Sequence, residues 1–207
     1  MMRIGLDFDN TIIRYDDVFR QVAKARGLVS TDFSGTKQQV REVIRLLPDG
    51  EPKWQALQGH VYGKGIHNAT LFSGLGEFLR RARAHGDKVL VVSHKTEYGH
   101  FDLDRINLRQ AAMRWMEMQG FFADQGYSML PDDIHFASTR AEKLKRIGDL
   151  RCDVFIDDLE EVLTDPEFPN YVRRILFSEH AEKTHDLPYD VCRDWAAIEE
   201  MIFFERR

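Results

Sequence analysis

The sequence predicts an α/β fold: a three-layer, Rossmann-like parallel sheet with a small helical cap inserted after the first strand. Short apolar runs rich in β-branched residues alternate with helical patterns, an order typical of sheets with right-handed crossovers. Several runs are apolar throughout, as expected for parallel strands that are covered on both faces. The 207 residues, 43% of them hydrophobic, suffice for one large domain or for a core with a small accessory domain.

Five runs predict the strands, and four helical patterns lie between or after them. The runs are MRIGLDF (2–8), KVLVVSH (88–94), DIHFAS (133–138), DVFIDD (153–158) and RRILFSE (173–179). In the pattern at 74–86 the apolar residues recur on one stripe, and Gly86 ends it. The other helical patterns lie at 108–122, 139–150 and 195–207.

The segment 14–72 interrupts the alternation of strands and helices. It contains three helix-like pieces and no convincing strand, and it is too long for an ordinary connection. Because the segment leaves the carboxyl end of the first strand, where open α/β sheets bind ligands, we expect a helical cap over that edge. The predicted domains are therefore an α/β core of 1–13 and 73–207 and a cap of 14–72.

Polar side chains gather where the predicted strands end. In a parallel sheet these ends share one edge, so residues far apart in sequence converge there. The residues are Asp7, Asp9 and Thr11 after the first strand, Ser93, His94 and Lys95 after the second, Lys143 and Lys145 in the helix after the third, and Asp157 and Asp158 after the fourth.

The chemistry of these residues suits phosphoryl transfer. Several carboxylates crowd together only with a counter-charge, and Mg²⁺ is a hard cation that binds carboxylates, waters and phosphate oxygens. An ionised Asp beside Mg²⁺ and a lysine can act as nucleophile and form an aspartyl-phosphate. The Asp two residues further on can protonate the leaving oxygen, while Ser93 and a lysine hold the other phosphate oxygens. His94 follows Ser93 directly and is a further candidate for substrate contact.

These motifs resemble those of the haloacid-dehalogenase-type (HAD) phosphohydrolases. DFDNT (7–11) is similar to the DxDxT signature, and Ser93, a downstream lysine and FIDD (155–158) follow in the family's order. The resemblance covers roughly 1–13 and 73–200, and the insert has the position of that family's small helical cap. It implies that Asp7 is the nucleophile and Asp9 the general acid/base, which favours a phosphatase over a dehalogenase. It also implies Mg²⁺ bound by Asp7, the Asp9 carbonyl and the pair of Asp157 and Asp158.

Two assignments remain open between neighbours. Lys143 and Lys145 lie about 200° apart on a helix, so only one of them faces the site. Thr139 with Glu142 predicts a capping box that places Lys143 near the sheet edge, which favours Lys143. The pattern does not distinguish which of the adjacent Asp157 and Asp158 contacts the metal directly.

The composition of the chain limits which partners and which cellular compartment we expect. A net charge of −5 without a long basic run gives no reason to expect nucleic acid. The sequence has no apolar run long enough for a membrane span and no signal-peptide pattern, and Cys152 and Cys192 make no disulfide framework. We therefore expect a cytoplasmic protein, with oligomeric state not indicated.

The predicted function is Mg²⁺-dependent hydrolysis of a small phosphorylated metabolite, such as a sugar phosphate or nucleotide. A phosphotransferase or mutase of the same family is an alternative, because the phosphoenzyme can be transferred to an acceptor other than water. A non-catalytic phosphate-binding module is the other alternative.

Overall fold

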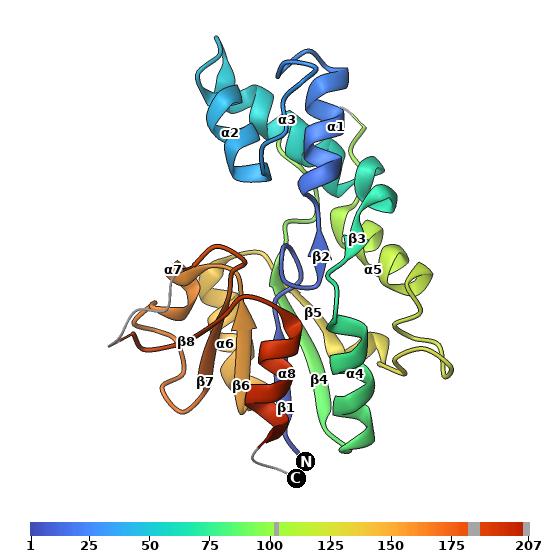
Figure 1. The fold of residues 1–207 in the computed structure, drawn as a ribbon, viewed down its shortest axis with the longest axis vertical. Helices are drawn as coiled ribbons and strands as arrows, with labels where there is room; N and C mark the ends of the chain where they lie inside the picture. Colours follow the sequence, from blue (N-terminus) through green and yellow to red (C-terminus); the bar gives the residue numbers. More distant parts are fainter. Residues whose placement is uncertain (102–103, 182–186, 205–207) are drawn as a thin grey trace. The chain divides into compact units, whose positions relative to one another are not determined.

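Six parallel strands form the main sheet in the computed structural model of this chain, which describes residues 1–101, 104–181 and 187–204 (Figure 1). The predicted parallel sheet is thereby confirmed. Its strand order is β5-β4-β1-β6-β7-β8, so the first strand lies inside the sheet. The strands are β1 (Arg3–Leu6), β4 (Lys88–His94), β5 (Ile134–Ala137), β6 (Val154–Asp157), β7 (Arg173–Phe177) and β8 (Asp190–Cys192).

The register of β1 explains why the strand ends meet. Leu6 pairs with Val91 of β4 on one side and with Ile156 of β6 on the other. The residues that follow Leu6, Val91 and Ile156 therefore lie at the same edge of the sheet. Five of the six strands lie in the predicted runs, whereas β8 has only three residues and gives too short an apolar run to be recognised.

The chain divides into two compact units. The first comprises Met1–Ile13, Leu71–His94 and Gly120–Arg207, and the second comprises Arg14–Thr70 and Lys95–Gln119. The strands β2 (Ile13–Arg14) and β3 (Thr70–Leu71) form a separate two-stranded sheet where the chain passes between the units.

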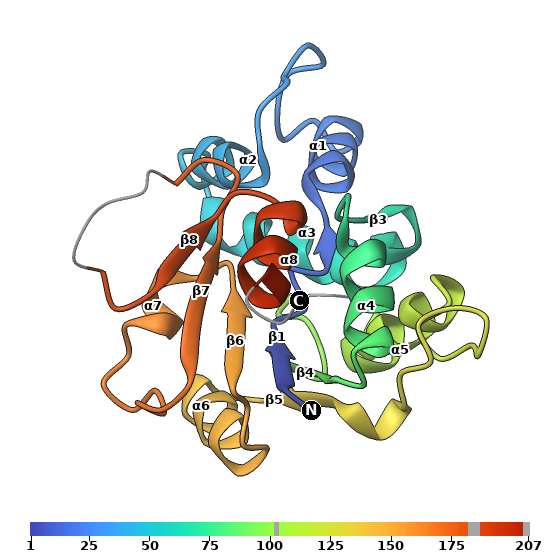
Figure 2. The same ribbon diagram turned by 60° about the horizontal axis from the view of Figure 1, so that its bottom comes forward.

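Helices complete the first unit around the sheet (Figure 2). Here α4 packs beside α8, where Phe78 lies 4.9 Å from Trp195 between ring centroids, and α6 packs against β4 and β5. The helices of this unit are α4 (Leu75–Ala84), η2 (Pro131–Asp133), α6 (Arg140–Asp149), α7 (Glu160–Leu163) and α8 (Trp195–Phe203).

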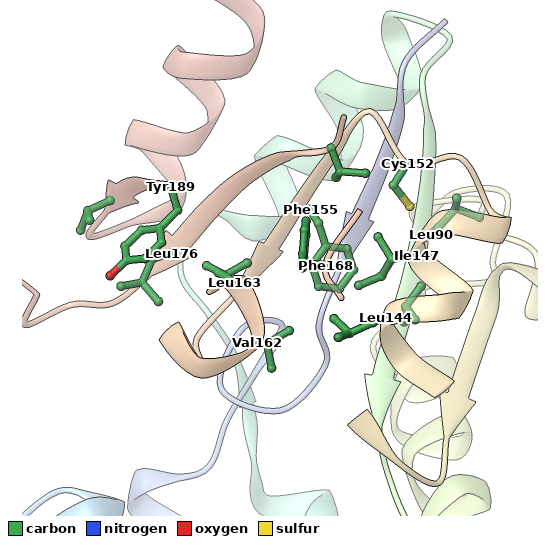
Figure 3. Packing of buried hydrophobic residues seen from close by; sticks show 13 residues of the cluster. Leu90, Leu144, Ile147, Cys152, Phe155, Val162, Leu163, Phe168, Leu176 and Tyr189 are labelled. Atoms are coloured by element: carbon green, nitrogen blue, oxygen red, sulfur yellow. The ribbon is translucent and has the colours of Figure 1, made fainter. Parts of the chain in front are cut away.

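A buried cluster fixes α6 and α7 against the sheet (Figure 3). Leu144 and Ile147 of α6 share it with Phe155 of β6, Val162 of α7 and Phe168. Burying these large side chains removes apolar area from water, worth about 1.5–3 kcal/mol for each fully buried one. Because Leu144 is anchored in this way, its neighbour Lys143 is held at a defined place beside the sheet.

The second unit is built of helices. Its helices are α1 (Asp16–Ala25), α2 (Lys37–Arg45), α3 (Gly50–Tyr62), η1 (Lys64–Asn68) and α5 (Leu108–Met118). The division differs from the predicted domains, because Lys95–Gln119 groups with the insert and not with the core. The reason is the packing of α5, which contacts α3 and η1, with Trp115 Nε1 donating to the Ala69 carbonyl at 3.1 Å. Within the described residues, no helix has the length and apolar character of a membrane span.

Candidate active site

Two carboxylates meet at the carboxyl edge of the sheet. Asp7 directly follows β1, and its backbone N–H donates to the Ile156 carbonyl of β6 at 2.9 Å. Asp157 is the last residue of β6. Because β1 and β6 are adjacent and parallel, the two aspartates lie side by side at this edge. Both are buried, Asp157 completely.

Lys143 bridges these carboxylates. Its Nζ lies 2.6 Å from Asp7 Oδ1 and 2.6 Å from Asp157 Oδ2, and the residue is only 1% exposed. Lys145 lies on the exposed side of α6, where it pairs with Asp149 at 2.7 Å. The structure therefore brings Lys143, and not Lys145, to the aspartates, which is the alternative that the sequence favoured.

The start of α6 differs in one detail from the predicted capping box. Thr139 Oγ1 accepts the Glu142 N–H at 3.2 Å, as an N-cap should. The Glu142 carboxylate, however, accepts the Ser138 N–H at 2.7 Å and not the N–H of Thr139. Both hydrogen bonds satisfy backbone N–H groups at the start of α6. They therefore fix the residue at which the helix begins, and this start places Lys143 at the end of the first turn, beside the sheet edge.

A third carboxylate is oriented by a residue that the sequence analysis missed. Asn10 donates through Nδ2 to Asp158 Oδ2 at 3.1 Å, and Asp158 is half-buried. Asn10 has φ 58, a left-handed conformation that Asn tolerates better than most residues. The sequence does contain a signal for this turn: Asn10 directly follows Asp9, and Asn adopts the left-handed conformation more readily than most residues. Asp157 is held separately, its Oδ1 accepting the Leu159 N–H at 3.0 Å.

The electrostatics of the cluster favour an additional cation. Burial raises the pKa of Asp7 to about 7, against the opposing charge of Lys143, and the carboxylates of Asp157 and Asp9 raise it further. The two carboxylates raise the pKa of Lys143 and overcome its burial, so the ammonium stays charged. One ammonium thus faces several carboxylates. Carboxylate oxygens of Asp7, Asp157 and Asp158 lie within 4.8 Å of one another, a donor set that fits a hard divalent cation.

Two buried hydroxyls belong to the same edge. Ser93 lies on β4 two residues beyond Val91, the partner of Leu6, and Thr11 lies in the turn after β1. Both side chains are buried, and their Oγ atoms have no hydrogen-bond partner among the described residues. Because an unpaired buried hydroxyl is unfavourable, these two groups suit hydrogen bonding to a ligand.

The remaining predicted site residues, Asp9 and His94, differ in their exposure and in their contacts. Asp9 is half-buried, and its charge is close enough to act on the pKa of Asp7. His94, by contrast, is exposed, and its Nε2 lies 3.0 Å from the Ser138 carbonyl in the turn before α6. This contact orients the imidazole toward that turn, so the structure does not place His94 among the aspartates.

Comparison with known proteins gives matches in structure only. No protein-family model matches the sequence, and no curated protein shows significant similarity to it. A HAD-superfamily hydrolase from Ehrlichia chaffeensis is 13% identical with a TM-score of 0.58, and the alignment covers 100% of both chains. A HAD family hydrolase from Deinococcus radiodurans R1, solved with bound phosphate and sodium, is 13% identical with a TM-score of 0.59, covering 98% of this chain and 95% of the other.

A third similar structure is that of Protein Tyrosine Kinase A from Mycobacterium tuberculosis. It is 16% identical with a TM-score of 0.59, and 97% of each chain is covered. At these identities the likeness is one of fold. The chain has the α/β fold of the HAD-superfamily hydrolases over its whole length.

Proposed function

We propose that this protein is a phosphatase that hydrolyses phosphomonoesters through an aspartyl-phosphate on Asp7. The observation that carries the proposal is the buried cluster in which Lys143 bridges Asp7 and Asp157 at 2.6 Å each. Its position at the carboxyl edge of a parallel sheet is where such folds bind ligands. The fold that the chain shares with HAD-superfamily hydrolases supports the same reaction class.

In the proposed mechanism, Asp7 attacks the phosphorus atom and the ester oxygen leaves. Asp9 protonates that oxygen and then takes a proton from the water that hydrolyses the aspartyl-phosphate. Lys143 stabilises negative charge on the transferred group, and its ammonium lowers the pKa of Asp7 and so favours the ionised nucleophile. The Ser93 and Thr11 hydroxyls, which have no partner among the described residues, donate to phosphate oxygens.

Mg²⁺ is the proposed cofactor, with Asp7, Asp157, Asp158 and the Asp9 carbonyl as the residues that hold it. The three clustered carboxylates support this assignment. When bound, the ion supplies positive charge that offsets the phosphate and the carboxylates. The proposed substrate is a small phosphorylated metabolite in the cytoplasm, and the second unit is the proposed cap that determines which one. Reduced Cys152 and Cys192 are consistent with that compartment.

The test is turnover of a phosphomonoester panel in the presence of Mg²⁺. We expect Asp7→Asn to abolish both turnover and phosphoenzyme formation. Asp9→Asn is expected to slow the reaction most for poor leaving groups, because these need the proton. Asp149→Asn is the control, since that carboxylate pairs with Lys145 at the surface. Full turnover by Asp7→Asn, or no hydrolysis of any panel member by the wild type, would show the proposal to be wrong.

A phosphotransferase is the second candidate. The structural similarity to Protein Tyrosine Kinase A from Mycobacterium tuberculosis supports this candidate, because a similar fold occurs in a protein named as a kinase. Analysis of products with added alcohol acceptors separates the two activities. Release of inorganic phosphate at a rate independent of the acceptor supports the phosphatase, whereas phosphorylated acceptor supports the transferase.

A further inference from the structure

The turn after β1 contains an amide that supports one carboxylate of the cluster formed by Asp7, Asp157 and Asp158. Asn10 Nδ2 donates to Asp158 Oδ2 at 3.1 Å. The carboxylate oxygens of the three aspartates lie within 4.8 Å of one another. An amide nitrogen donates hydrogen bonds, whereas hard cations take oxygen ligands. Through this contact Asn10 therefore holds a candidate metal ligand without being a ligand itself.

The backbone at Asn10 does not need this side chain. Asn10 has φ 58, a left-handed conformation that glycine adopts without steric cost. Backbone groups close the turn, since the Asn10 N–H donates to the Ile13 carbonyl at 2.9 Å. The Ile12 N–H also donates to the Phe8 carbonyl, at 3.0 Å. Glycine would therefore serve the turn at least as well, and what asparagine adds is the hydrogen bond to Asp158.

The three carboxylates of the cluster differ in how they are confined. Lys143 Nζ lies 2.6 Å from both Asp7 and Asp157, and these two aspartates are buried. Asp158, in contrast, is half-buried. Because packing confines a half-buried side chain less, a hydrogen bond such as that from Asn10 has more influence on its rotamer.

Mg²⁺ and Ca²⁺ place different demands on such a cluster. Mg²⁺ requires near-octahedral geometry with oxygens at about 2.0–2.1 Å, whereas Ca²⁺ accepts about six to eight oxygens at longer distances in flexible geometry. A carboxylate that rotates out of place therefore lowers the affinity for Mg²⁺ more than the affinity for Ca²⁺. Hydrogen bonds from outer residues to metal ligands typically contribute about 10- to 100-fold to metal affinity.

We propose that Asn10 is a positioning residue that orients Asp158 and thereby raises the preference of the site for Mg²⁺ over Ca²⁺. The inference rests on the proposed function, because that function assigns a metal ion to these carboxylates. It does not depend on which phosphorylated metabolite is the substrate. Asn10 acts on the metal through Asp158 and takes no part in the chemistry at Asp7.

The experiment titrates Mg²⁺ and, separately, Ca²⁺ into the metal-free full-length protein, with binding measured by calorimetry. Asn10→Gly keeps a residue suited to the left-handed turn and removes the amide. We expect it to weaken Mg²⁺ binding at least about tenfold and Ca²⁺ binding less than about threefold. Asn170→Gly is the control, because it makes the same change at an exposed position before β7. It should leave both affinities within about twofold of the wild type.

A double-mutant cycle tests whether Asn10 acts through Asp158. Asp158→Asn should weaken Mg²⁺ binding by itself, and adding Asn10→Gly should weaken it further by less than about twofold. Losses that multiply as independent effects would overturn the proposal, because Asn10 would then act by another route. Thermal unfolding in EDTA checks the turn, and Asn10→Gly should shift the metal-free Tm by less than about 4 °C. A larger fall in Tm with equal loss of affinity for both ions would assign Asn10 a structural role only.

The outcomes separate this inference from the proposed function. Wild-type affinity for Mg²⁺ in Asn10→Gly, or an equal loss for both ions, overturns the inference and leaves the metal site in place. No saturable Mg²⁺ binding by the wild type overturns the metal site and the inference with it. Because binding is measured without turnover, a protein that binds Mg²⁺ but hydrolyses no phosphomonoester contradicts the proposed reaction alone.

Discussion

At the scale of single residues, Lys143 and Lys145 form a natural pair for comparison. Both are on α6, yet Lys143 is buried between two carboxylates and Lys145 pairs with Asp149 at the surface. Lys143→Met should destabilise the metal-free protein by about 3–5 kcal/mol, because it leaves two buried carboxylates without their counter-charge. Lys145→Met should change stability by no more than about 1 kcal/mol. Urea unfolding measures both.

Turnover of the same two variants shows whether Lys143 contributes to activity as well as to stability. Lys143→Met should also lower kcat by about 10²-fold or more, since a group that offsets charge in the transition state is lost. Lys145→Met keeps the same aliphatic stem and should retain turnover within about twofold. If both variants lose activity equally, the charge of Lys143 is not the determinant that the geometry indicates.

His135 on β5 gives a pH dependence with a defined sign. Its Nε2 is buried with no hydrogen-bond partner among the described residues. Burial lowers its pKa, and Arg146 and Lys88 add to this while Asp133 and Asp132 oppose it. The folded state therefore binds this proton less readily than the unfolded state does. Stability from the neutral imidazole is present above about pH 6.5 and is lost as the pH falls below that value.

His135→Gln should therefore flatten the fall in unfolding midpoint between pH 7 and pH 5, as measured by thermal unfolding. The control is His180→Gln, which removes an exposed histidine. If His135→Gln has the same pH profile as the wild type, the imidazole is not the titrating group.

At the scale of elements, the packing of β1 against its neighbours leaves no room at Gly5. A Cβ at this position would lie 2.4 Å from Phe155 Cδ2 and 2.9 Å from Cys152 Sγ. Gly5→Ala should therefore destabilise the protein by about 1–3 kcal/mol through overpacking.

Gly148 provides the matched control. It lies in α6, and a Cβ there would come no closer than 3.5 Å to Pro169. Gly148→Ala should leave stability unchanged or raise it by up to about 1 kcal/mol, because alanine favours helix. Chemical denaturation of the two variants distinguishes the effects, and equal stability of both would contradict the packing at β1.

The strands and helices also show which features of the site and the fold can be predicted from the sequence. Asp7, Ser93, Lys143 and Asp157 were assigned to one edge because continuous apolar strands imply a parallel sheet, whose carboxyl ends must meet. The contact of Asn10 with Asp158 was missed, since it depends on a left-handed turn that no periodic pattern encodes. The grouping of α5 was also missed, because an amphipathic pattern identifies the apolar face of a helix and not the unit against which that face packs.

At the scale of the whole molecule, opposite charges are divided between the two units. The first unit carries the excess of acidic residues, and three of its carboxylates are concentrated at one edge of the sheet. Without a cation, these carboxylates repel one another, and the raised pKa of Asp7 reflects the burial and repulsion. The fold therefore accepts a local loss of stability at the site where we propose that Mg²⁺ binds.

Mg²⁺ should recover that stability by mass action. At a concentration about 100-fold above its Kd, binding to the folded state alone adds about 2.7 kcal/mol. For a chain of this size this corresponds to a rise of roughly 5–10 °C in Tm, measured by calorimetry with and without the metal. Asp158→Asn should reduce this rise, since it removes one carboxylate from the cluster while keeping an amide oxygen near Asn10.

In the absence of metal, Asp158→Asn should not lower the stability of the protein. Because Asp158→Asn removes a negative charge from a repulsive cluster, its Tm in EDTA should equal or exceed that of the wild type. Asp149→Asn, with its carboxylate at the surface beside Lys145, should keep the full response to Mg²⁺. NaCl at matched ionic strength separates specific binding from screening. A rise in Tm that NaCl reproduces, or that Asp158→Asn retains in full, would contradict a metal site formed by these carboxylates.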